Sequence, residues 1–361
     1  MKASENPSIQ KYLDEVCFPI AYAENTIGKL IDVDDNNIYQ NQFKGIALNP
    51  NHSRNLIRTD KTPEVDAYGN ITNGAEIYLD THSKGRADRK YENPNTHEFD
   101  RVGYKVLNNN DFIPKIIEAL DNTGMDCTKA EIIENVRYSP NNSATWGTLV
   151  LKDHPINIEL PNGNSAKQYP TIDWTNSYDK TFCARLWAGL YGGACLNRQV
   201  FAGWAIMQYT HKHIKRKDGS SGVDMDVIQA KIDGLKGTFE TITKQCKSWA
   251  DTPLTESQAK GILAKTLAWN NQTRQASEKK LEELVNWFTM YEAKHSGMNL
   301  WSLYNTATHF ATHGNTNDVS TTLSANQLQK LQQTVVFMIQ SPTWKHYNSN
   351  EFINPPKKTL V

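Results

Sequence analysis

Cationic and aromatic side chains are interleaved between residues 137 and 217 of the 361-residue chain. This segment holds ten Lys and Arg residues and eleven Phe, Trp and Tyr residues, against four acidic ones. Such a combination suits single-stranded nucleic acid, because cations neutralise phosphates while unstacked bases lie on flat rings. We therefore expect phosphate contacts from Lys152, Lys167, Lys180, Arg185, Lys212, Lys215, Arg216 and Lys217, and base stacking on Trp174, Tyr178 and Tyr191.

Two less specific explanations of the same segment stay open. Aromatic rings more often fill a protein core than bind a ligand, so packing inside a sheet would account for them as well. The basic residues 211–217 cannot all be buried. They form either a solvated strand end or a contact with phosphate.

His309 and His313 lie four residues apart in a stretch with helical periodicity. On a helical wheel they share a face with Asn305, opposite the apolar face, so core positions are not expected for them. Two histidines at this spacing can bind a metal ion, but no third ligand has a fitting position. We therefore predict no metal and no cofactor. A polar contact with a neighbouring domain, a subunit or a phosphate is expected here, and an idle helix face is the alternative.

Motifs of the common enzyme classes are missing from the sequence. It has no phosphate-binding loop of the Walker type and no GxGxxG, HExxH or GxSxG motif. A stretch that begins like a calcium loop at Asp32 has Asn37 where the turn needs Gly and Phe43 where the loop needs Glu. We therefore predict a protein that is not an enzyme. An enzyme with a histidine-lined site is the remaining alternative to this prediction.

Charge is balanced over the whole chain, with 39 basic and 39 acidic residues, but it is distributed unevenly. Residues 1–150 carry a net charge of −6 and residues 151–361 a net charge of +6, so a polyanion should prefer the second half.

The chain shows no signal peptide, and no apolar stretch reaches the roughly 20 residues that span a bilayer. Its five cysteines are scattered and form no CxxC pair. These features predict a cytoplasmic protein without membrane contact.

Hydrophobic periodicity predicts an α+β fold in three regions. Residues 1–110 are acidic and rich in loops, with short strands. Residues 111–218 form a helix and then a central, mostly antiparallel sheet with helices packed on one face. Residues 219–361 form a helical region. Within the sheet, the Pro-Asn-Gly-Asn sequence of residues 161–164 predicts a hairpin turn.

Two apolar stripes at helical spacing predict core-facing helices in the last region. One long amphipathic helix is expected from the stripe Ile228, Ile232, Leu235, Phe239, Ile242, Cys246 and Trp249. A second helix is expected from the stripe Leu281, Leu284, Val285, Phe288 and Tyr291. Between them, Thr255 and Gln258 have the spacing of a capping box.

Two stretches resemble a phage and plasmid-type family of domains of unknown function that is found in prophages and mobile elements. Residues 175–180, Arg185 and residues 189–200 are similar to its NSxDG and GLFRxxCxNGL motifs, with departures at Gly192 and Arg198. Residues 301–313 are similar to its WxxYNAxTxxxTH ending. The resemblance implies a phage or mobile-element protein in a bacterial cytoplasm, and members of this family tend to lie beside replication and recombination genes. The outline is also similar to that of ring-forming single-strand annealing proteins.

The residues and the resemblance together favour a protein that binds single-stranded DNA in recombination or strand annealing, without nucleotide hydrolysis. We expect single-stranded nucleic acid as its partner and a homo-oligomer as its assembly. A virion structural protein or a host-interaction protein is the main alternative. Such a protein would use the same aromatic residues for contacts between proteins, and it would show no affinity for oligonucleotides.

Overall fold

The computed structural model describes residues 1–24, 30–32, 38–39, 54–58, 64–65, 71–73, 77–79, 90–92, 99–101, 106–133, 144–178, 183–192, 198–199, 208–211, 223–270, 272–313 and 325–347. The chain divides into two compact units. Unit 1 consists of Met1–Thr148, Asp173–Leu186 and Tyr209–Asp233, and unit 2 consists of Leu149–Ile172, Trp187–Gln208 and Gly234–Val361. These units interleave along the sequence. The three consecutive regions expected from hydrophobic periodicity stay a prediction.

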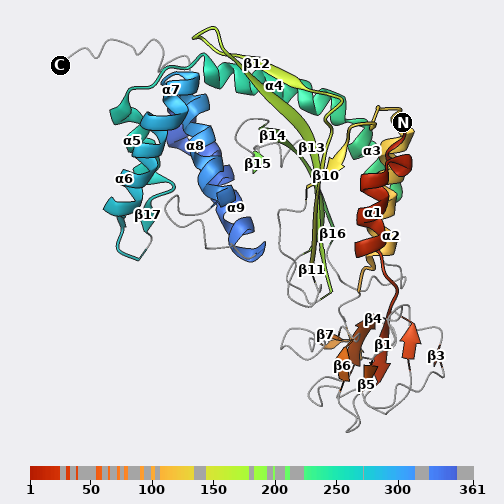
Figure 1. The fold of residues 1–361 in the computed structure, drawn as a ribbon. Helices are drawn as coiled ribbons and strands as arrows, with labels where there is room; N and C mark the ends of the chain where they lie inside the picture. Colours follow the sequence, from red (N-terminus) through yellow and green to blue (C-terminus); the bar gives the residue numbers. More distant parts are fainter. Residues whose placement is uncertain are drawn as a thin grey trace. The chain divides into compact units, whose positions relative to one another are not determined.

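The fold is α+β, as predicted, and its strands form two larger sheets (Figure 1). The first sheet has the order β3-β2-β1-β4-β7 and only antiparallel pairings. Its strands are β1 (Ile20–Glu24), β2 (Leu30–Asp32), β3 (Ile38–Tyr39), β4 (Arg54–Arg58) and β7 (Ile77–Leu79). Two further antiparallel pairs join β5 (Glu64–Val65) to β6 (Ile71–Asn73) and β8 (Lys90–Glu92) to β9 (Phe99–Arg101).

The second sheet has the order β10-β11-β13-β14-β15, with β12 also paired to β13 and β16 also paired to β14. Its strands are β10 (Glu131–Ile132), β11 (Ala144–Val150), β12 (Ile156–Glu159), β13 (Ser165–Ser177), β14 (Ala184–Gly192), β15 (Arg198–Gln199) and β16 (Gln208–His211). The hairpin predicted at residues 161–164 is confirmed, since Glu159 pairs with Ser165 across the turn. Gly163 has a φ of +82° in this turn, a conformation that glycine adopts without strain.

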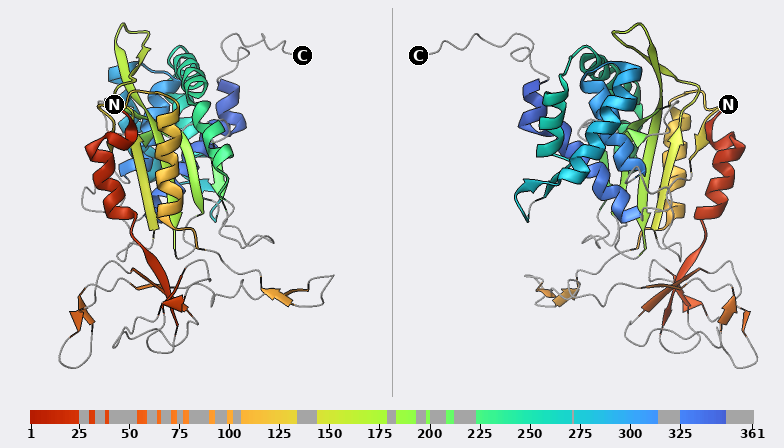
Figure 2. Two further views of the ribbon diagram at one scale, coloured as in Figure 1. Left: turned by 90° about the vertical axis from the view of Figure 1, so that its right-hand side faces the viewer. Right: turned by 60° about the vertical axis from the view of Figure 1, so that its left-hand side comes forward.

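Among its described residues, unit 1 contains three α-helices: α1 (Pro7–Val16), α2 (Asn109–Asn122) and α3 (Met225–Asp233). Figure 2 shows α1 and α2 as neighbours within this unit. The helix expected from Asp111 begins two residues earlier, because the side chain of Asn108 accepts a hydrogen bond from the backbone N–H of Asn110 and caps the first turn. The apolar side of α2 is buried, which confirms the spacing that predicted it.

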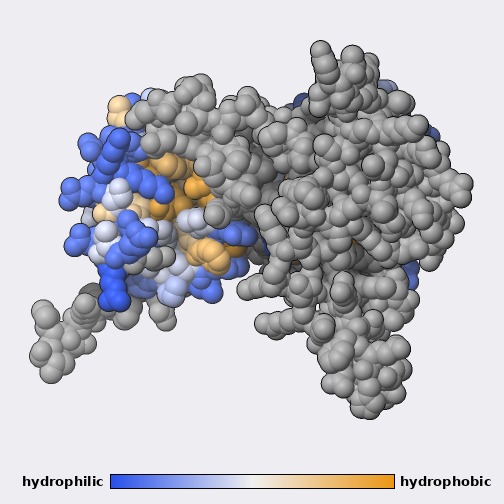
Figure 3. All heavy atoms as spheres, turned by 90° about the horizontal axis from the view of Figure 1, so that it is seen from below, coloured by the Kyte–Doolittle hydropathy of each residue, from blue (hydrophilic) through white to orange (hydrophobic). Residues whose placement is uncertain are grey.

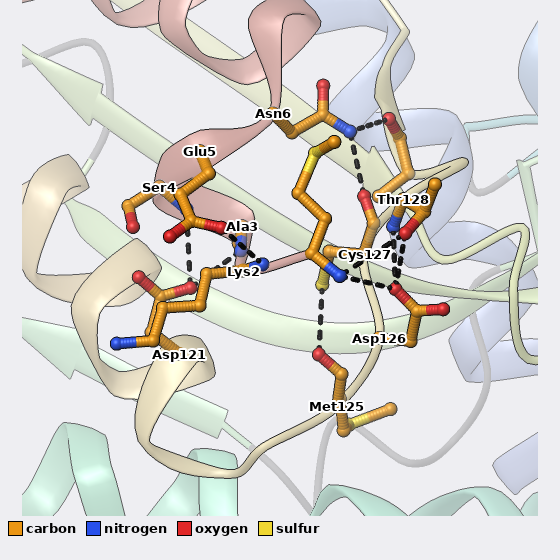
Figure 4. A network of polar contacts seen from close by, with 12 residues as sticks. Lys2, Ala3, Ser4, Glu5, Asn6, Asp121, Met125, Asp126, Cys127 and Thr128 are labelled. Atoms are coloured by element: carbon orange, nitrogen blue, oxygen red, sulfur yellow. Dashed lines mark hydrogen bonds and ion pairs between the residues drawn. The ribbon is translucent and has the colours of Figure 1, made fainter.

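The start of the chain, including the 3₁₀ turn η1 (Ala3–Glu5), is fastened to the last turn of α2 and to the residues that follow it (Figure 4). The backbone N–H of Ala3 donates to the carboxylate of Asp121 at 2.6 Å. Asn6 is buried, and its Nδ2 donates to the carbonyls of Cys127 at 2.7 Å and Ala130 at 2.8 Å. These hydrogen bonds join segments more than one hundred residues apart in the sequence.

Helices make up most of the described residues from 234 onward, in accordance with the predicted helical C-terminal region. They are α4 (Leu235–Ala250), α5 (Glu256–Lys265), α6 (Glu278–Trp287), the π-helical turn η4 (Phe288–Glu292), α7 (Ala293–Ser296), α8 (Leu300–His313), α9 (Ala325–Gln340) and α10 (Pro342–Tyr347). A short hairpin of β17 (Trp269–Asn270) and β18 (Gln275–Ala276) connects α5 to α6. Within the described ranges, no helix combines the length and the apolar character needed to cross a bilayer.

The first predicted apolar stripe is buried along its whole length, but it belongs to two helices instead of one. Gly234 separates α3 from α4, and glycine costs a helix interior roughly 1 kcal/mol relative to alanine. The predicted capping box is confirmed: the hydroxyl of Thr255 accepts from the backbone N–H of Gln258, whose side chain accepts from the backbone N–H of Thr255.

Helix α8 forms the centre of the core of unit 2. Its residues from Leu300 to Thr308 are all buried, on every side of the helix. The predicted apolar face is therefore confirmed, whereas the opposite face is also packed against protein. Four large buried rings lie together in this core, with Trp249 in contact with Tyr304 and Trp344 and Trp301 in contact with Tyr304.

Candidate functional site

The three rings expected to stack on bases are buried. Trp174, Tyr178 and Tyr191 expose 0%, 1% and 6% of their surface, respectively. A base needs an open ring face, so the predicted stacking role is wrong for these residues in the folded chain. Their large apolar surfaces instead contribute to the core, which is the explanation that the sequence analysis left open.

Trp174 lies in the core of unit 1, in space that a glycine on the neighbouring strand leaves free. A Cβ atom at Gly147 would lie 2.1 Å from Cε2 of Trp174, so the indole occupies the space that any other residue at 147 would need. The ring meets Tyr12 edge-on, with the centroids 5.7 Å apart, and its Nε1 donates to the Tyr12 hydroxyl at 3.2 Å. The indole of β13 therefore packs against β11 and α1, and none of its surface is exposed.

The motif around Asn176 also has a structural role. Nδ2 of Asn176 donates to Oδ1 of Asn109 at 2.8 Å, and Nδ2 of Asn109 donates to the carbonyl of Val16 and the hydroxyl of Thr145, both at 2.9 Å. The backbone N–H of Asn109 donates to the hydroxyl of Tyr178 at 3.2 Å. These buried hydrogen bonds connect the sheet to the end of α1 and the start of α2.

The predicted phosphate contacts have different environments. Lys167 is exposed on β13, and its ammonium lies 5.3 Å from the ring centroid of Tyr169. Lys152 is half-buried in the turn after β11, and Arg185 is half-buried on β14. Lys152 and Lys167 belong to unit 2, and Arg185 belongs to unit 1. The other five predicted cations lie outside the described residues: Lys180, Lys212, Lys215, Arg216 and Lys217.

His309 stacks on an aromatic ring. It lies half-buried on α8, with its ring 3.9 Å from that of Trp287 and 15° from parallel. The side chain of His313 lies outside the described residues. Among the side chains that the structure describes, no group of three or more His, Cys, Asp or Glu residues could hold a metal ion. The idle helix face considered in the sequence analysis is wrong, because Asn305 is buried and His309 packs against α6.

A second ring covers the other side of Trp287. Tyr291 lies 4.3 Å from Trp287, centroid to centroid and 26° from parallel, and it exposes 60% of its surface. The order is thus Tyr291, Trp287, His309, from the solvent toward α8. We call these three residues the ring stack. It is an ordered set of parallel rings with one open end, which is the geometry that the buried rings of the sheet lack.

The second predicted stripe fails at Tyr291 because the helix changes its period there. Turn η4 is π-helical, so its hydrogen bonds run from residue i to i+5 and each turn holds more residues than an α-helical turn. Tyr291 therefore rotates out of the apolar stripe, and Glu292 enters the interior with 6% of its surface exposed. Nε1 of Trp287 donates to Oε1 of Glu292, five residues later, at 3.3 Å. This hydrogen bond fixes the middle ring of the stack.

Burial also changes the chemistry of Glu292. Removal from water raises the pKa of this carboxyl above its ordinary value of 4.5, and the hydrogen bond from Trp287 opposes part of that increase. The folded chain consequently binds more protons than the unfolded chain as the pH rises above 4.5 toward the raised pKa. In that window the free energy of unfolding contributed by Glu292 falls with rising pH.

Replacing Glu292 by Gln should raise the melting temperature at pH 7, because the amide keeps an acceptor for Trp287 and carries no charge to bury. Between pH 4.5 and pH 7 the free energy of unfolding should also fall less in the variant than in the wild type. Thermal unfolding of both proteins across this pH range checks the prediction. Glu282→Gln, at an exposed position of α6, is the control for a general charge effect. An equal pH dependence in wild type and Glu292→Gln would contradict it.

The sequence analysis did not single out Trp287 and placed Tyr291 in the core. Trp287 and Tyr291 are four residues apart, a spacing that places them on one side of a helix, and this signal was available. The π-helical turn could not be predicted from the sequence, because a stripe drawn with 3.6 residues per turn assumes a regular α-helix throughout.

Comparison with family models assigns most of the chain to a known family. The family model described as "Domain of unknown function (DUF932)" matches residues 97–336, about two thirds of the chain. Both stretches that carried the family resemblance lie inside this range. No curated protein and no solved structure matches.

Proposed function

We propose that this chain, which belongs to the DUF932 family of domains of unknown function, is a phage or mobile-element protein that binds single-stranded DNA. The mobile-element origin rests on the motif resemblance of residues 175–200 and 301–313. The protein would act in recombination or strand annealing in the host cytoplasm, as a homo-oligomer. In this proposal no bond is made or broken, and neither a nucleotide nor a metal ion is needed.

The observation that carries the proposal is the cation and ring pair on the β12–β13 hairpin. Lys167 is exposed, makes no ion pair with a described acidic residue, and holds its ammonium 5.3 Å from the ring centroid of Tyr169. An exposed ammonium keeps its three donors available for phosphate oxygens. The half-buried Lys152 belongs to the same unit. The basic residues 212–217 add to the proposal from the sequence alone.

Oligonucleotide titration at two salt concentrations tests this function. A labelled single strand should bind more tightly than the duplex of the same sequence, and binding should weaken as salt increases. Native mass measurement of the complex would report the number of subunits. If neither oligonucleotide binds and the protein instead assembles with a protein partner, the proposal fails and the virion or host-interaction role is favoured.

Replacing Lys167 by Ala should weaken binding of the single strand and reduce the slope of log affinity against log salt by about 0.7, the value for one phosphate contact on a single strand. The control is Lys11→Ala on α1, which removes the same charge from a lysine paired with Glu15 at 4.0 Å. Fluorescence polarisation at several salt concentrations measures both slopes. An unchanged slope in Lys167→Ala would remove this residue from the interface.

A further inference from the structure

Exposure of large side chains does not by itself indicate a binding site on this protein. Figure 3 shows apolar side chains among hydrophilic ones on the described surface of the helical region, as is usual for folded proteins. Within the part of the chain that the structure describes, three large aromatic residues are exposed: Trp269, Tyr291 and Phe337. Of these three, Tyr291 alone has a ring partner, because Trp287 stacks behind it.

That partner makes Tyr291 a preorganised surface. Trp287 is fixed from two sides, by the hydrogen bond to the buried Glu292 and by the stacked ring of His309. Tyr291, held parallel to Trp287, therefore loses little further freedom when a flat group covers its open face. Preorganisation of this kind reduces the entropic cost of binding. A nucleobase is a flat group of this kind, and it stacks on aromatic side chains largely independent of sequence.

Basic residues follow this ring closely in the chain, and the β12–β13 hairpin is hydrogen-bonded to the same segment. Lys294 on α7 follows Tyr291 by three residues and is exposed, as is His295. The carbonyl of His295 accepts hydrogen bonds from Nδ2 of Asn162 at 2.8 Å and Nδ2 of Asn164 at 3.2 Å. Both asparagines belong to the turn of the β12–β13 hairpin, so this turn is fastened to the end of α7 within unit 2.

We infer that the open face of Tyr291 is the platform on which an unpaired base of a single-stranded nucleic acid stacks. Lys294 and the hairpin residue Lys167, both exposed in unit 2, supply cations to phosphates of the same strand. The inference rests on the proposed function, and it assigns base stacking to the ring stack in place of the buried Trp174, Tyr178 and Tyr191.

A comparison of normal and abasic oligonucleotides tests this site with the full-length protein. The probes are a labelled oligo(dT) and an abasic oligonucleotide of equal length, which keeps the phosphates and lacks the bases. Wild type should bind oligo(dT) more tightly than the abasic strand. Tyr291→Ala should lose roughly 5- to 150-fold in affinity for oligo(dT), the range for one stacked base. Its affinity for the abasic strand should not change.

Two control variants separate stacking from other effects. Tyr291→Phe keeps the ring and should bind as wild type does, whereas Phe337→Ala removes an exposed ring that has no stacked partner among the described residues and should also leave binding unchanged. An unchanged melting temperature in Tyr291→Ala would show that the fold is intact.

The outcomes distinguish this inference from the function on which it rests. If wild type binds both strands equally, or if Tyr291→Ala binds oligo(dT) as wild type does, the stacking site is overturned while phosphate binding stands. If wild type binds neither strand, the proposed function is overturned together with the site.

Discussion

Replacing Gly147 by Ala is expected to lower the free energy of unfolding by about 3 kcal/mol, the upper end of the range for overpacked cores. The added Cβ would lie 2.1 Å from Cε2 of Trp174 and 2.2 Å from Cζ2. Neither side can yield easily, because Gly147 lies inside β11 and the indole is fully buried against Tyr12. Urea unfolding followed by circular dichroism measures the loss.

The same substitution at Gly237 should have the opposite sign. Gly237 lies in α4, and a Cβ atom there would meet no heavy atom within 4 Å apart from its chain neighbours and the backbone of its own helix. Alanine stabilises a helix by roughly 0.5 to 1 kcal/mol relative to glycine, so Gly237→Ala is expected to raise stability. If both alanines changed the unfolding midpoint in the same direction, the clash with Trp174 would not be the cause.

A smaller ring at position 174 should relieve the clash. Trp174→Phe alone should destabilise the protein, because it leaves a cavity and removes the hydrogen bond to the Tyr12 hydroxyl. Combined with Gly147→Ala, it should cost about 1 to 2 kcal/mol less than the sum of the two single changes, since the two residues share one space. Strict additivity in this double-mutant cycle would contradict the proposed contact.

Helical periodicity predicted most of the helical region because its apolar residues pack on one side for many turns. The stripe from Ile228 to Trp249 is buried throughout, and its only departure is the break at Gly234, a residue with low helix propensity. The hairpin at 161–164 was predictable for a similar reason, since Asn and Gly meet the backbone requirements of a tight turn.

The faces of strand β13 could not be predicted in the same way. Alternation along a strand separates an inner face from an outer face only where one of them meets water. In β13, every residue from Pro170 to Ser177 is buried, on both faces. Trp174 therefore had no open side to offer to a ligand. From the sequence of such a strand one can read which aromatic residues it contains, but one cannot predict that both of its faces are covered.

The ring stack was missed because one extra residue per turn reverses which side chain faces inward. Glu292 follows Tyr291 directly, and a regular α-helix would have kept the tyrosine in the stripe. The structure places the acid inside and the ring outside. A buried carboxyl beside an exposed ring contradicts the usual preference of both residue types, and π-helical turns of this kind are frequent at functional sites.

Replacing Asn6 by Ala is expected to lower the free energy of unfolding by about 3 kcal/mol. Its Nδ2 donates to the carbonyls of Cys127 and Ala130, and both hydrogen bonds are buried. Its Oδ1 accepts from the backbone N–H of Ser8 and caps α1. Alanine would remove the cap and leave two carbonyls without their donor at once. Urea unfolding, with α-helix content as the signal, measures this loss.

Serine at the same position separates the two contributions, since its hydroxyl can cap α1 but cannot reach both carbonyls. Asn6→Ser should therefore recover about 1 kcal/mol of the loss seen in Asn6→Ala. Asn6→Asp keeps a capping oxygen but faces the carbonyls of Cys127 and Ala130 with a negative charge, so it should be no more stable than Asn6→Ala. A stable Asn6→Asp variant would show that Asn6 contributes to stability through its cap alone. The two donated hydrogen bonds would then contribute nothing measurable to that attachment.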